Sequence, residues 1–218
     1  MSHKVHPYAH RLGIVRDWQS RWFGRRGQYQ QFLKADVLLR EYLDKKLRGL
    51  YINTIEIERG NNSLRVIIKT SRPGMLIGRS GEGATKLKND VLKFLIKLGA
   101  TVPKDFRLDI EEVKNPESHA RIAGQMIVEG LEKRMPGKRV VRQVMDKVMA
   151  NKNAEGVRVT LSGRLGGAEI GRVETLKKGR LPLQTLRADI DFAREKAYLP
   201  YGVIGVKTWI YRGEIFEK

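Results

Sequence analysis

The tetrapeptide Gly78-Arg79-Ser80-Gly81 constrains the fold of this 218-residue chain more than any other feature. It lies between a stretch with the alternation of a strand and a long stretch with the period of a helix. Glycines let the backbone turn tightly and approach an anion without a Cβ in the way. Backbone N–H groups at the start of the following helix can then face a phosphate. This setting predicts a loop that holds the sugar-phosphate backbone of RNA.

The segments around this loop carry the pattern of an RNA-binding module. Leu39, Leu43 and Leu47 recur at every fourth position and predict a helix. The turn Gly60-Asn61-Asn62 separates two alternating stretches and predicts a hairpin. We expect a helix over residues 32–48, then two strands over 53–58 and 64–69. A short helix, the Gly-x-x-Gly loop, a long helix over 82–98 and a strand over 106–111 follow. This order is that of a prokaryotic-type (type II) KH domain, which we place at residues 32–113.

The rest of the chain predicts two further parts. Asn115-Pro116 breaks the pattern and indicates a domain boundary. Residues 114–218 predict a second α+β domain, with two helices packed on a mostly antiparallel sheet. Its helices are expected over residues 117–134 and 138–150, and its strands over 157–162, 168–175, 186–195 and 203–211. Residues 1–31 are basic and aromatic without a sustained period, which predicts an extended N-terminal arm. The predicted fold class of the whole chain is therefore α+β.

The charge balance indicates a polyanionic partner. The chain has 43 Lys and Arg against 24 Asp and Glu, a net charge of +19. The basic residues are interleaved with apolar ones, which is typical of a folded basic protein rather than a charged tail. An anionic membrane is the alternative polyanion, but no helix pairs a Lys/Arg face with a bulky apolar face. No apolar run approaches the roughly 18 residues of a membrane span, so we expect no membrane partner.

Nothing in the sequence predicts catalysis, a cofactor or a metal site. There is no cysteine, which rules out disulfides and thiolate ligands and fits a reducing cytoplasm. His3, His6 and His10 lie in the arm without nearby carboxylates, and His119 lies in an expected helix beside Ala120. No nucleotide-binding loop, nucleophile motif or paired carboxylates are present.

Several stretches, taken in order, resemble the KH-containing family of bacterial small-subunit ribosomal proteins, number three in the usual numbering. They are KVHP and RLGIV at 4–7 and 11–15, RPG and IGRSG at 72–74 and 77–81, SGRLGGAEI at 162–170, LRADID at 186–191, and YGVIGVK at 201–207. The chain departs from the family at Ser80, where a second basic residue is frequent. The helix after the loop, with its turn over 99–105, is also longer than in many relatives.

The resemblance implies a structural protein of the small-subunit head. Such a protein binds small-subunit ribosomal RNA, lines the channel where messenger RNA enters, and contacts neighbouring head and channel proteins. The expected location is the cytoplasmic ribosome. Two alternatives are a free-standing KH regulator of messenger or small RNA and an RNA-processing enzyme. The basic arm and the second basic domain argue against the first, and the missing catalytic residues argue against the second.

The resemblance also assigns basic residues to the messenger channel. Lys138, Arg139 and Arg142 lie on one side of an expected helix whose other side is apolar. Lys133 and Arg134 lie just upstream. We expect these five cations to hold the single-stranded messenger backbone without reading its sequence. The alternative is an ordinary solvated face of an amphipathic helix.

Contacts with ribosomal RNA are expected from further basic residues, which position a protein on RNA rather than specify a sequence. They are Lys4, Arg11, Arg164, Arg172, Lys177, Lys178, Arg180 and Arg187. The glycine-rich stretch at 162–167 could instead be only a hairpin turn. Trp18, Trp22 and Phe23, which lie among arginines, either stack on bases or anchor the arm on its own domain.

Overall fold

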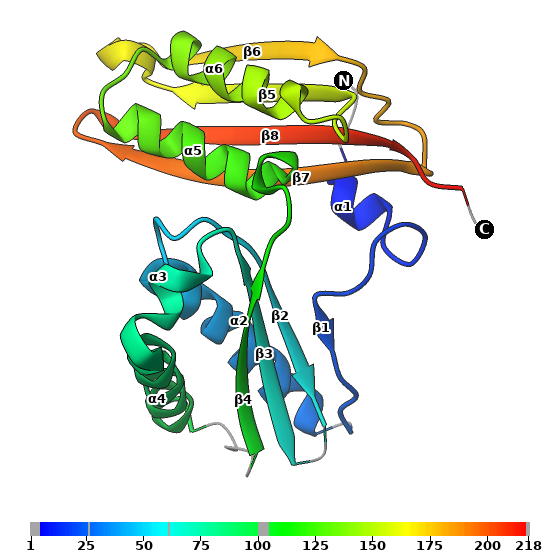
Figure 1. The fold of residues 1–218 in the computed structure, drawn as a ribbon, viewed down its shortest axis with the longest axis vertical. Helices are drawn as coiled ribbons and strands as arrows, with labels where there is room; N and C mark the ends of the chain where they lie inside the picture. Colours follow the sequence, from blue (N-terminus) through cyan, green and yellow to red (C-terminus); the bar gives the residue numbers. More distant parts are fainter. Residues whose placement is uncertain (1–4, 26, 61, 100–104, 217–218) are drawn as a thin grey trace. The chain divides into compact units, whose positions relative to one another are not determined.

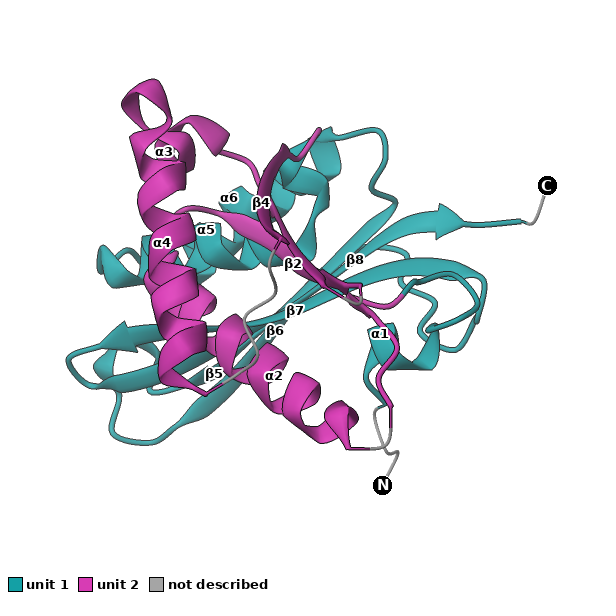
Figure 2. Cartoon of the chain, turned by 90° about the horizontal axis from the view of Figure 1, so that it is seen from below, with its two compact units in different colours: residues 1–17, 115–218 teal, residues 18–114 magenta. Residues whose placement is uncertain are grey.

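The computed structural model describes residues 5–25, 27–60, 62–99 and 105–216. The chain forms two compact units, each with its own core (Figure 1, Figure 2). Unit 1 consists of residues 1–17 and 115–218, and unit 2 consists of residues 18–114. The fold class is α+β, as the sequence predicts.

Unit 2 contains a four-stranded mixed sheet with helices on one face. Its elements are β1 (Ser20–Arg21), α2 (Gln28–Lys46), β2 (Ile52–Arg59), β3 (Ser63–Thr70), α3 (Pro73–Ile77), the 3₁₀ turn η1 (Arg79–Gly81), α4 (Glu82–Lys97) and β4 (Asp105–Glu112). The sheet order is β1-β2-β3-β4. Strand β2 is antiparallel to β3, whereas β1 and β4 run parallel to their neighbours.

The core of unit 2 follows from the two periodicities of its sequence. Leu87, Val91 and Leu95 lie on one side of α4 and are buried, because residues three to four apart share a helix face. Ile57 and Val66 face each other across β2 and β3 and are fully buried. Burial of each such side chain contributes about 1.5–3 kcal/mol to stability. This packing holds the loop at the start of α4 at the edge of the core.

Unit 1 contains a four-stranded antiparallel sheet of order β6-β5-β8-β7. Its elements are α1 (Pro7–His10), the 3₁₀ turn η2 (Pro116–Ser118), α5 (Ala120–Glu132), α6 (Gly137–Ala150), β5 (Gly156–Gly163), the 3₁₀ turn η3 (Leu165–Gly167), β6 (Arg172–Gly179), β7 (Ala188–Leu199) and β8 (Gly202–Glu214). Helix α5 packs on β7 and β8, and α6 packs on β5 and β6, both on one face of the sheet (Figure 1).

The structure differs from the expected extended arm over residues 1–31. The described part of residues 1–17 belongs to unit 1 and includes α1, while residues 18–25 belong to unit 2 and include β1. The reason is that each half has its own anchor. Arg11 is buried in unit 1, and Trp22 packs against Tyr29 and Phe32 in unit 2.

The strand expected over residues 168–175 begins and ends later than the alternation predicts. Strand β6 covers Arg172–Gly179, and residues 168–171 form an irregular bend after η3. The alternation misled because Ile170 is apolar yet 79% exposed. Pairing with β5, from Gly163 opposite Arg172 to Gly156 opposite Gly179, sets the actual bounds.

Candidate nucleic-acid interface

The Gly-x-x-Gly loop of unit 2 adopts a backbone shape that requires glycine. Gly78 has φ 70° and Gly81 has φ 79°, and Ser80 also lies in the left-handed region at φ 52°. Arg79 and Ser80 are exposed at the tip. No side chain caps α4 at Gly81, and the N–H of Glu82 donates to the carbonyl oxygen of Arg79, so an anion can reach the N–H groups that follow Glu82 in the first turn. The loop can therefore bind an RNA backbone through main-chain groups.

A glycine outside the tetrapeptide is equally necessary. A Cβ added to Gly83 would lie 2.5 Å from the carbonyl oxygen of Leu76 and 2.9 Å from that of Ile77. The first turn of α4 thus packs directly against the end of α3. Sequence reasoning gave Gly83 no role, although its place two residues after the loop was visible.

The basic residues of α6 are exposed, and their helix is anchored by its apolar side. Val141 and Val148 are at most 1% exposed, whereas Lys138, Arg139 and Arg142 are exposed. Lys138 forms an ion pair with Glu174 at 3.5 Å. Among the described residues, Arg139 and Arg142 have no side-chain hydrogen bond or ion pair and remain available to an external anion.

The turn between α5 and α6 adds the two upstream cations. Lys133 is exposed and donates to Glu129 at 2.6 Å. Arg134 is exposed and left-handed at φ 59°, so the chain reverses directly after it. Arg142 also lines a shallow hollow between α6 and β6 together with Asp146 and Lys178. The structure therefore links the residues expected at the messenger channel to part of the set expected on ribosomal RNA.

The residues expected on ribosomal RNA fall into two groups. Three are exposed and engaged: Arg164 donates to Ala168 O at 2.9 Å, Lys178 to Asp146 at 2.7 Å, and Arg187 to Glu214 at 2.6 Å. Arg172, Lys177 and Arg180 are exposed and form no side-chain hydrogen bond or ion pair within the part of the chain that the structure describes. The bond from Arg164 braces the glycine-rich turn, which is the structural role that the sequence left open. Lys4 lies outside the described residues.

Arg11 is a correction to the sequence analysis, which expected it on ribosomal RNA. Its side chain is 0% exposed. The guanidinium donates to the carbonyl oxygens of Pro7 at 3.0 Å, Leu183 at 3.0 Å and Thr185 at 2.8 Å. Arg11 therefore ties the N-terminal segment to the loop before β7 and offers nothing to RNA.

The aromatic residues of the expected arm divide in the same way. Trp22 Nε1 donates to Asp36 Oδ2 at 2.8 Å, and the Asp36 carboxylate also accepts from Arg59 Nε at 2.9 Å. Asp36 is only 2% exposed, so this buried charge is stabilised by the pairing. Trp22 is thus an anchor of unit 2, whereas Trp18 is 60% and Phe23 89% exposed.

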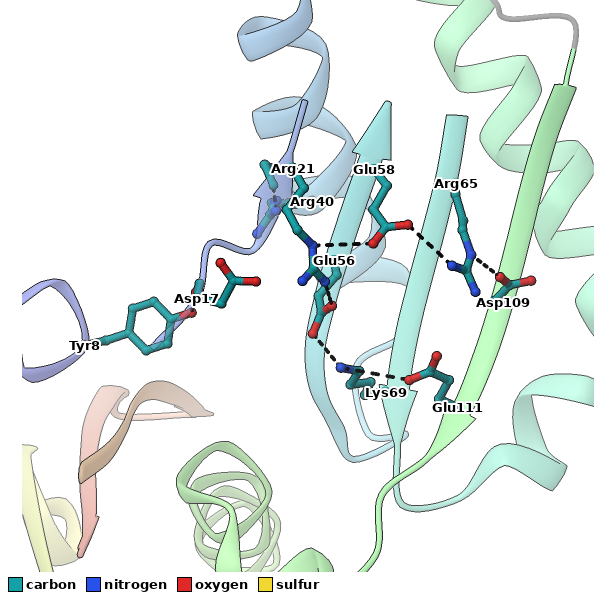
Figure 3. A network of polar contacts seen from close by, with 11 residues as sticks. Tyr8, Asp17, Arg21, Arg40, Glu56, Glu58, Arg65, Lys69, Asp109 and Glu111 are labelled. Carbon is teal, nitrogen blue, oxygen red and sulfur yellow. Dashed lines mark hydrogen bonds and ion pairs between the residues drawn. The ribbon is translucent and has the colours of Figure 1, made fainter. Parts of the chain in front are cut away.

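The face of the unit 2 sheet that points away from its core is electrically balanced. Arg65 bridges Glu58 at 3.4 Å and Asp109 at 2.5 Å, and Lys69 contacts Glu56 at 2.6 Å (Figure 3). Two more pairs extend the network, Arg21 with Glu56 at 2.5 Å and Lys69 with Glu111 at 3.9 Å. Arg107 of β4, opposite Arg65, forms no ion pair among the described residues, but the other cations of this face are paired with carboxylates, so the face offers little net charge to RNA.

His119 lies at the start of α5 among charged neighbours. Burial, followed by the neighbouring Arg212 cation, lowers the pKa of His119 to about 4. Arg212 also donates to Asp191 at 2.9 Å, and Asp191 accepts from the backbone N–H of Ala120 at 2.9 Å. This cluster caps the start of α5 and is structural. The described residues contain no group of three or more His, Asp or Glu side chains that could hold a metal.

None of the described helices combines the length and the apolar character needed to cross a membrane.

Comparisons with known proteins match two parts of the chain to two domain families. Residues 38–118 match the family model described as KH domain, and residues 127–210 match the one described as ribosomal protein S3, C-terminal domain. The chain is 43% identical over 218 residues to small ribosomal subunit protein uS3 of Caldicellulosiruptor saccharolyticus, covering 100% of this chain and 95% of that one. It is 44% identical over 215 residues to uS3 of Alcanivorax borkumensis, covering 99% and 90%. It is 42% identical over 214 residues to uS3c of Guillardia theta, covering 98% and 96%.

Proposed function

Because this chain belongs to the ribosomal protein uS3 family, we propose that it binds small-subunit ribosomal RNA in the subunit head and lines the channel where messenger RNA enters. Family membership makes it a ribosomal, RNA-binding structural protein and not an enzyme. The proposed partners are the ribosomal RNA, the messenger, and neighbouring head and channel proteins. The proposed location is the ribosome of a bacterial cytoplasm.

We assign the contacts with ribosomal RNA to both units. In unit 2 the Gly-x-x-Gly loop presents uncapped N–H groups, and its exposed Arg79 adds one cation. In unit 1 the exposed Arg172, Lys177 and Arg180 add cations that no carboxylate of the described chain neutralises. Contacts of this kind fix the orientation of a protein on RNA.

The observation that carries the messenger assignment is the pair Arg139 and Arg142 on α6. Both guanidinium groups are exposed, on a helix whose opposite side is buried against the sheet. The backbone of α6 is therefore rigid while its cations stay accessible. Such an arrangement holds a moving single strand by charge without gripping its bases.

The test is translation of messengers with and without a stable hairpin, using subunits that carry Lys138→Ala, Arg139→Ala and Arg142→Ala together. Folding should survive because the exposed Lys138–Glu174 pair contributes at most about 1 kcal/mol and alanine favours the helix. Translation through the hairpin should slow selectively.

The matched control replaces the exposed Lys34, Lys45 and Lys152 by alanine, which removes the same charge elsewhere. Its two translation rates should both match wild type. Equal slowing on both messengers by the α6 variant, or no slowing on either, would return α6 to an ordinary solvated face.

A further inference from the structure

The sheet of unit 1 has a second face, opposite α5 and α6. Val159, Val206 and their neighbours on β5 and β8 are buried toward the helices. Side chains alternate along a strand, so the residues between them point to the other side. We call that side the open face. By strand register its basic residues are Arg158, Lys177, Arg194, Lys196 and Lys207.

The cations of the open face stand directly beside one another. Lys207 lies opposite Arg194 on β7, and Arg158 lies opposite Lys177 on β6. Like charges directly opposite each other across two strands destabilise a sheet. The fold alone gains nothing from two such pairs side by side, whereas a bound polyanion would turn their repulsion into binding energy.

Four of these cations, Arg158, Lys177, Arg194 and Lys207, form no ion pair with any carboxylate of the described residues. Glu174 pairs with Lys138 of α6, Glu195 with Arg121 of α5, and Asp191 with Arg212 and the N–H of Ala120, all on the helix side. The others belong to the sheet end: Asp189 pairs with Arg16 and Glu214 with Arg187. On the matching face of unit 2, Arg21, Arg65 and Lys69 each meet a carboxylate, and Arg107 is the one strand cation of that face without an ion pair among the described residues (Figure 3).

Two aromatic rings stiffen the guanidinium groups on this face. Arg158 lies over Trp209 with 5.2 Å from Cζ to the ring centroid, and Arg194 lies over Phe192 at 5.3 Å. His6 packs edge-on against Phe192 at 4.8 Å, so the N-terminal segment meets the face at β7. Lys177, Arg194, Lys196 and Lys207 are exposed. Stacking on a ring holds a guanidinium group in place at little entropic cost. Arg194 is exposed and can present its N–H donors, whereas Arg158 is half-buried and its Nε is enclosed.

We propose that the open face binds the phosphate backbone of folded ribosomal RNA. This inference rests on the proposed function and extends it to residues that the sequence analysis, apart from Lys177, did not single out. The dimensions favour folded RNA over a single strand. Four strands about 4.8 Å apart make a face about 14 Å wide, and same-face residues along a strand are about 6.7 Å apart. A two-dimensional array of cations fits the backbones of a folded RNA better than one extended track.

The experiment is filter binding of the full chain to a transcript of small-subunit ribosomal RNA over a range of salt concentrations. The variant combines Lys177→Gln, Arg194→Gln and Lys207→Gln. Each lost phosphate contact lowers the salt slope by about 0.7–0.9, so three lower it by about 2–3 and weaken binding about 100-fold at 0.1 M salt. The control combines Lys34→Gln, Lys45→Gln and Lys152→Gln, with the same change in net charge, and its slope should change by less than one contact. Equal losses in the two variants would overturn the proposal.

Two further readouts separate the competing explanations. The open-face variant should melt no lower than wild type, because it removes like-charge pairs. If it fails to fold, Lys207→Thr alone tests the face, since threonine suits a strand. We expect that variant to lose about fivefold in affinity at 0.1 M salt, and unchanged affinity would overturn the proposal.

Polyuridine is the second probe. The difference in affinity between the open-face variant and the control should be smaller for polyuridine than for the folded transcript. A larger effect on polyuridine would move the face to single-stranded messenger and overturn the assignment to folded RNA. A wild-type chain that fails to bind the transcript at all would instead count against the proposed function.

Discussion

Replacement of Arg11 by glutamine tests whether this arginine is a structural clamp or an RNA contact. The structure gives it three carbonyl acceptors at 2.8–3.0 Å and no exposed surface. A hydrogen bond from a charged donor contributes about 1.5–3 kcal/mol, and a buried group that loses its partner costs about 1–3 kcal/mol. Glutamine has only two N–H donors on a shorter side chain and cannot satisfy all three acceptors. We therefore expect unit 1 to lose about 3–5 kcal/mol, a large part of the stability of an ordinary domain.

Native-state hydrogen exchange measures this loss separately in each unit. Core amides of β7 and β8 should exchange with a free energy of opening lowered by about 3–5 kcal/mol, because that value approaches global stability in core strands. Amides of β2 and β3 in unit 2 serve as the internal reference and should not change. Arg187→Gln is the matched control, since its exposed pair with Glu214 contributes at most about 1 kcal/mol.

The opposite pattern would refute the clamp. In that case Arg11→Gln would leave hydrogen exchange in β7 and β8 unchanged. It would also lower the salt slope of RNA binding by about 0.7–0.9, the value of one phosphate contact. Arg11 would then belong on the ribosomal RNA surface after all.

Three shorter predictions concern the loop, its support and a buried histidine. Arg79→Asp with Ser80→Asp should weaken RNA binding by unit 2 by about 1–3 kcal/mol without unfolding it, and unchanged affinity in filter binding would leave the loop a purely structural turn. Gly83→Ala forces a Cβ against a backbone carbonyl, so it should destabilise unit 2 by about 1–3 kcal/mol in urea unfolding, and an unchanged midpoint would refute the close packing. Between pH 6.5 and about 4 the unfolded chain protonates His119 and the folded chain does not, so the free energy of unfolding of unit 1 should fall by up to roughly 3 kcal/mol as pH falls. In hydrogen-exchange measurements, His119→Asn should flatten this dependence of stability on pH, and the exposed His10→Asn should not.

Local patterns predicted most of the elements, because each is stabilised by its own periodic face. The four-residue spacing of Leu39, Leu43 and Leu47 identified α2, and the glycines at 78 and 81 identified the loop before α4. Both signals operate within a few residues of chain. The fold class and the family were accessible from sequence for the same reason.

Contacts between distant residues could not be predicted. The partners of Arg11 at Leu183 and Thr185 lie 172 and 174 positions away, and an arginine in a basic segment gives no local sign of burial. The apolar Ile170 likewise suggested a strand over residues 168–175, but pairing with β5 begins only at Arg172. Ile170 is exposed because it lies before the first residue that pairs with β5.

The open face shows the same limit. Alternation marks Arg194 and Lys196 as one side of a strand, and Lys207 with Trp209 as one side of another. Whether these sides coincide depends on register, and β7 contains an irregularity between Ala188 and Ile190 that shifts it. Only the folded sheet brings the cations of separate strands onto one surface.

The central claim, that this chain is a built-in part of the small ribosomal subunit, is tested most directly by sedimentation. A lysate of cells that express the tagged full chain is separated on a sucrose gradient at low Mg²⁺, where the subunits dissociate, and the chain is quantified in each fraction. The account predicts that almost all of it sediments with the small subunit and almost none remains at the top. A large free pool at the top, with only traces on the subunit, would contradict the account and favour a free-standing RNA-binding regulator.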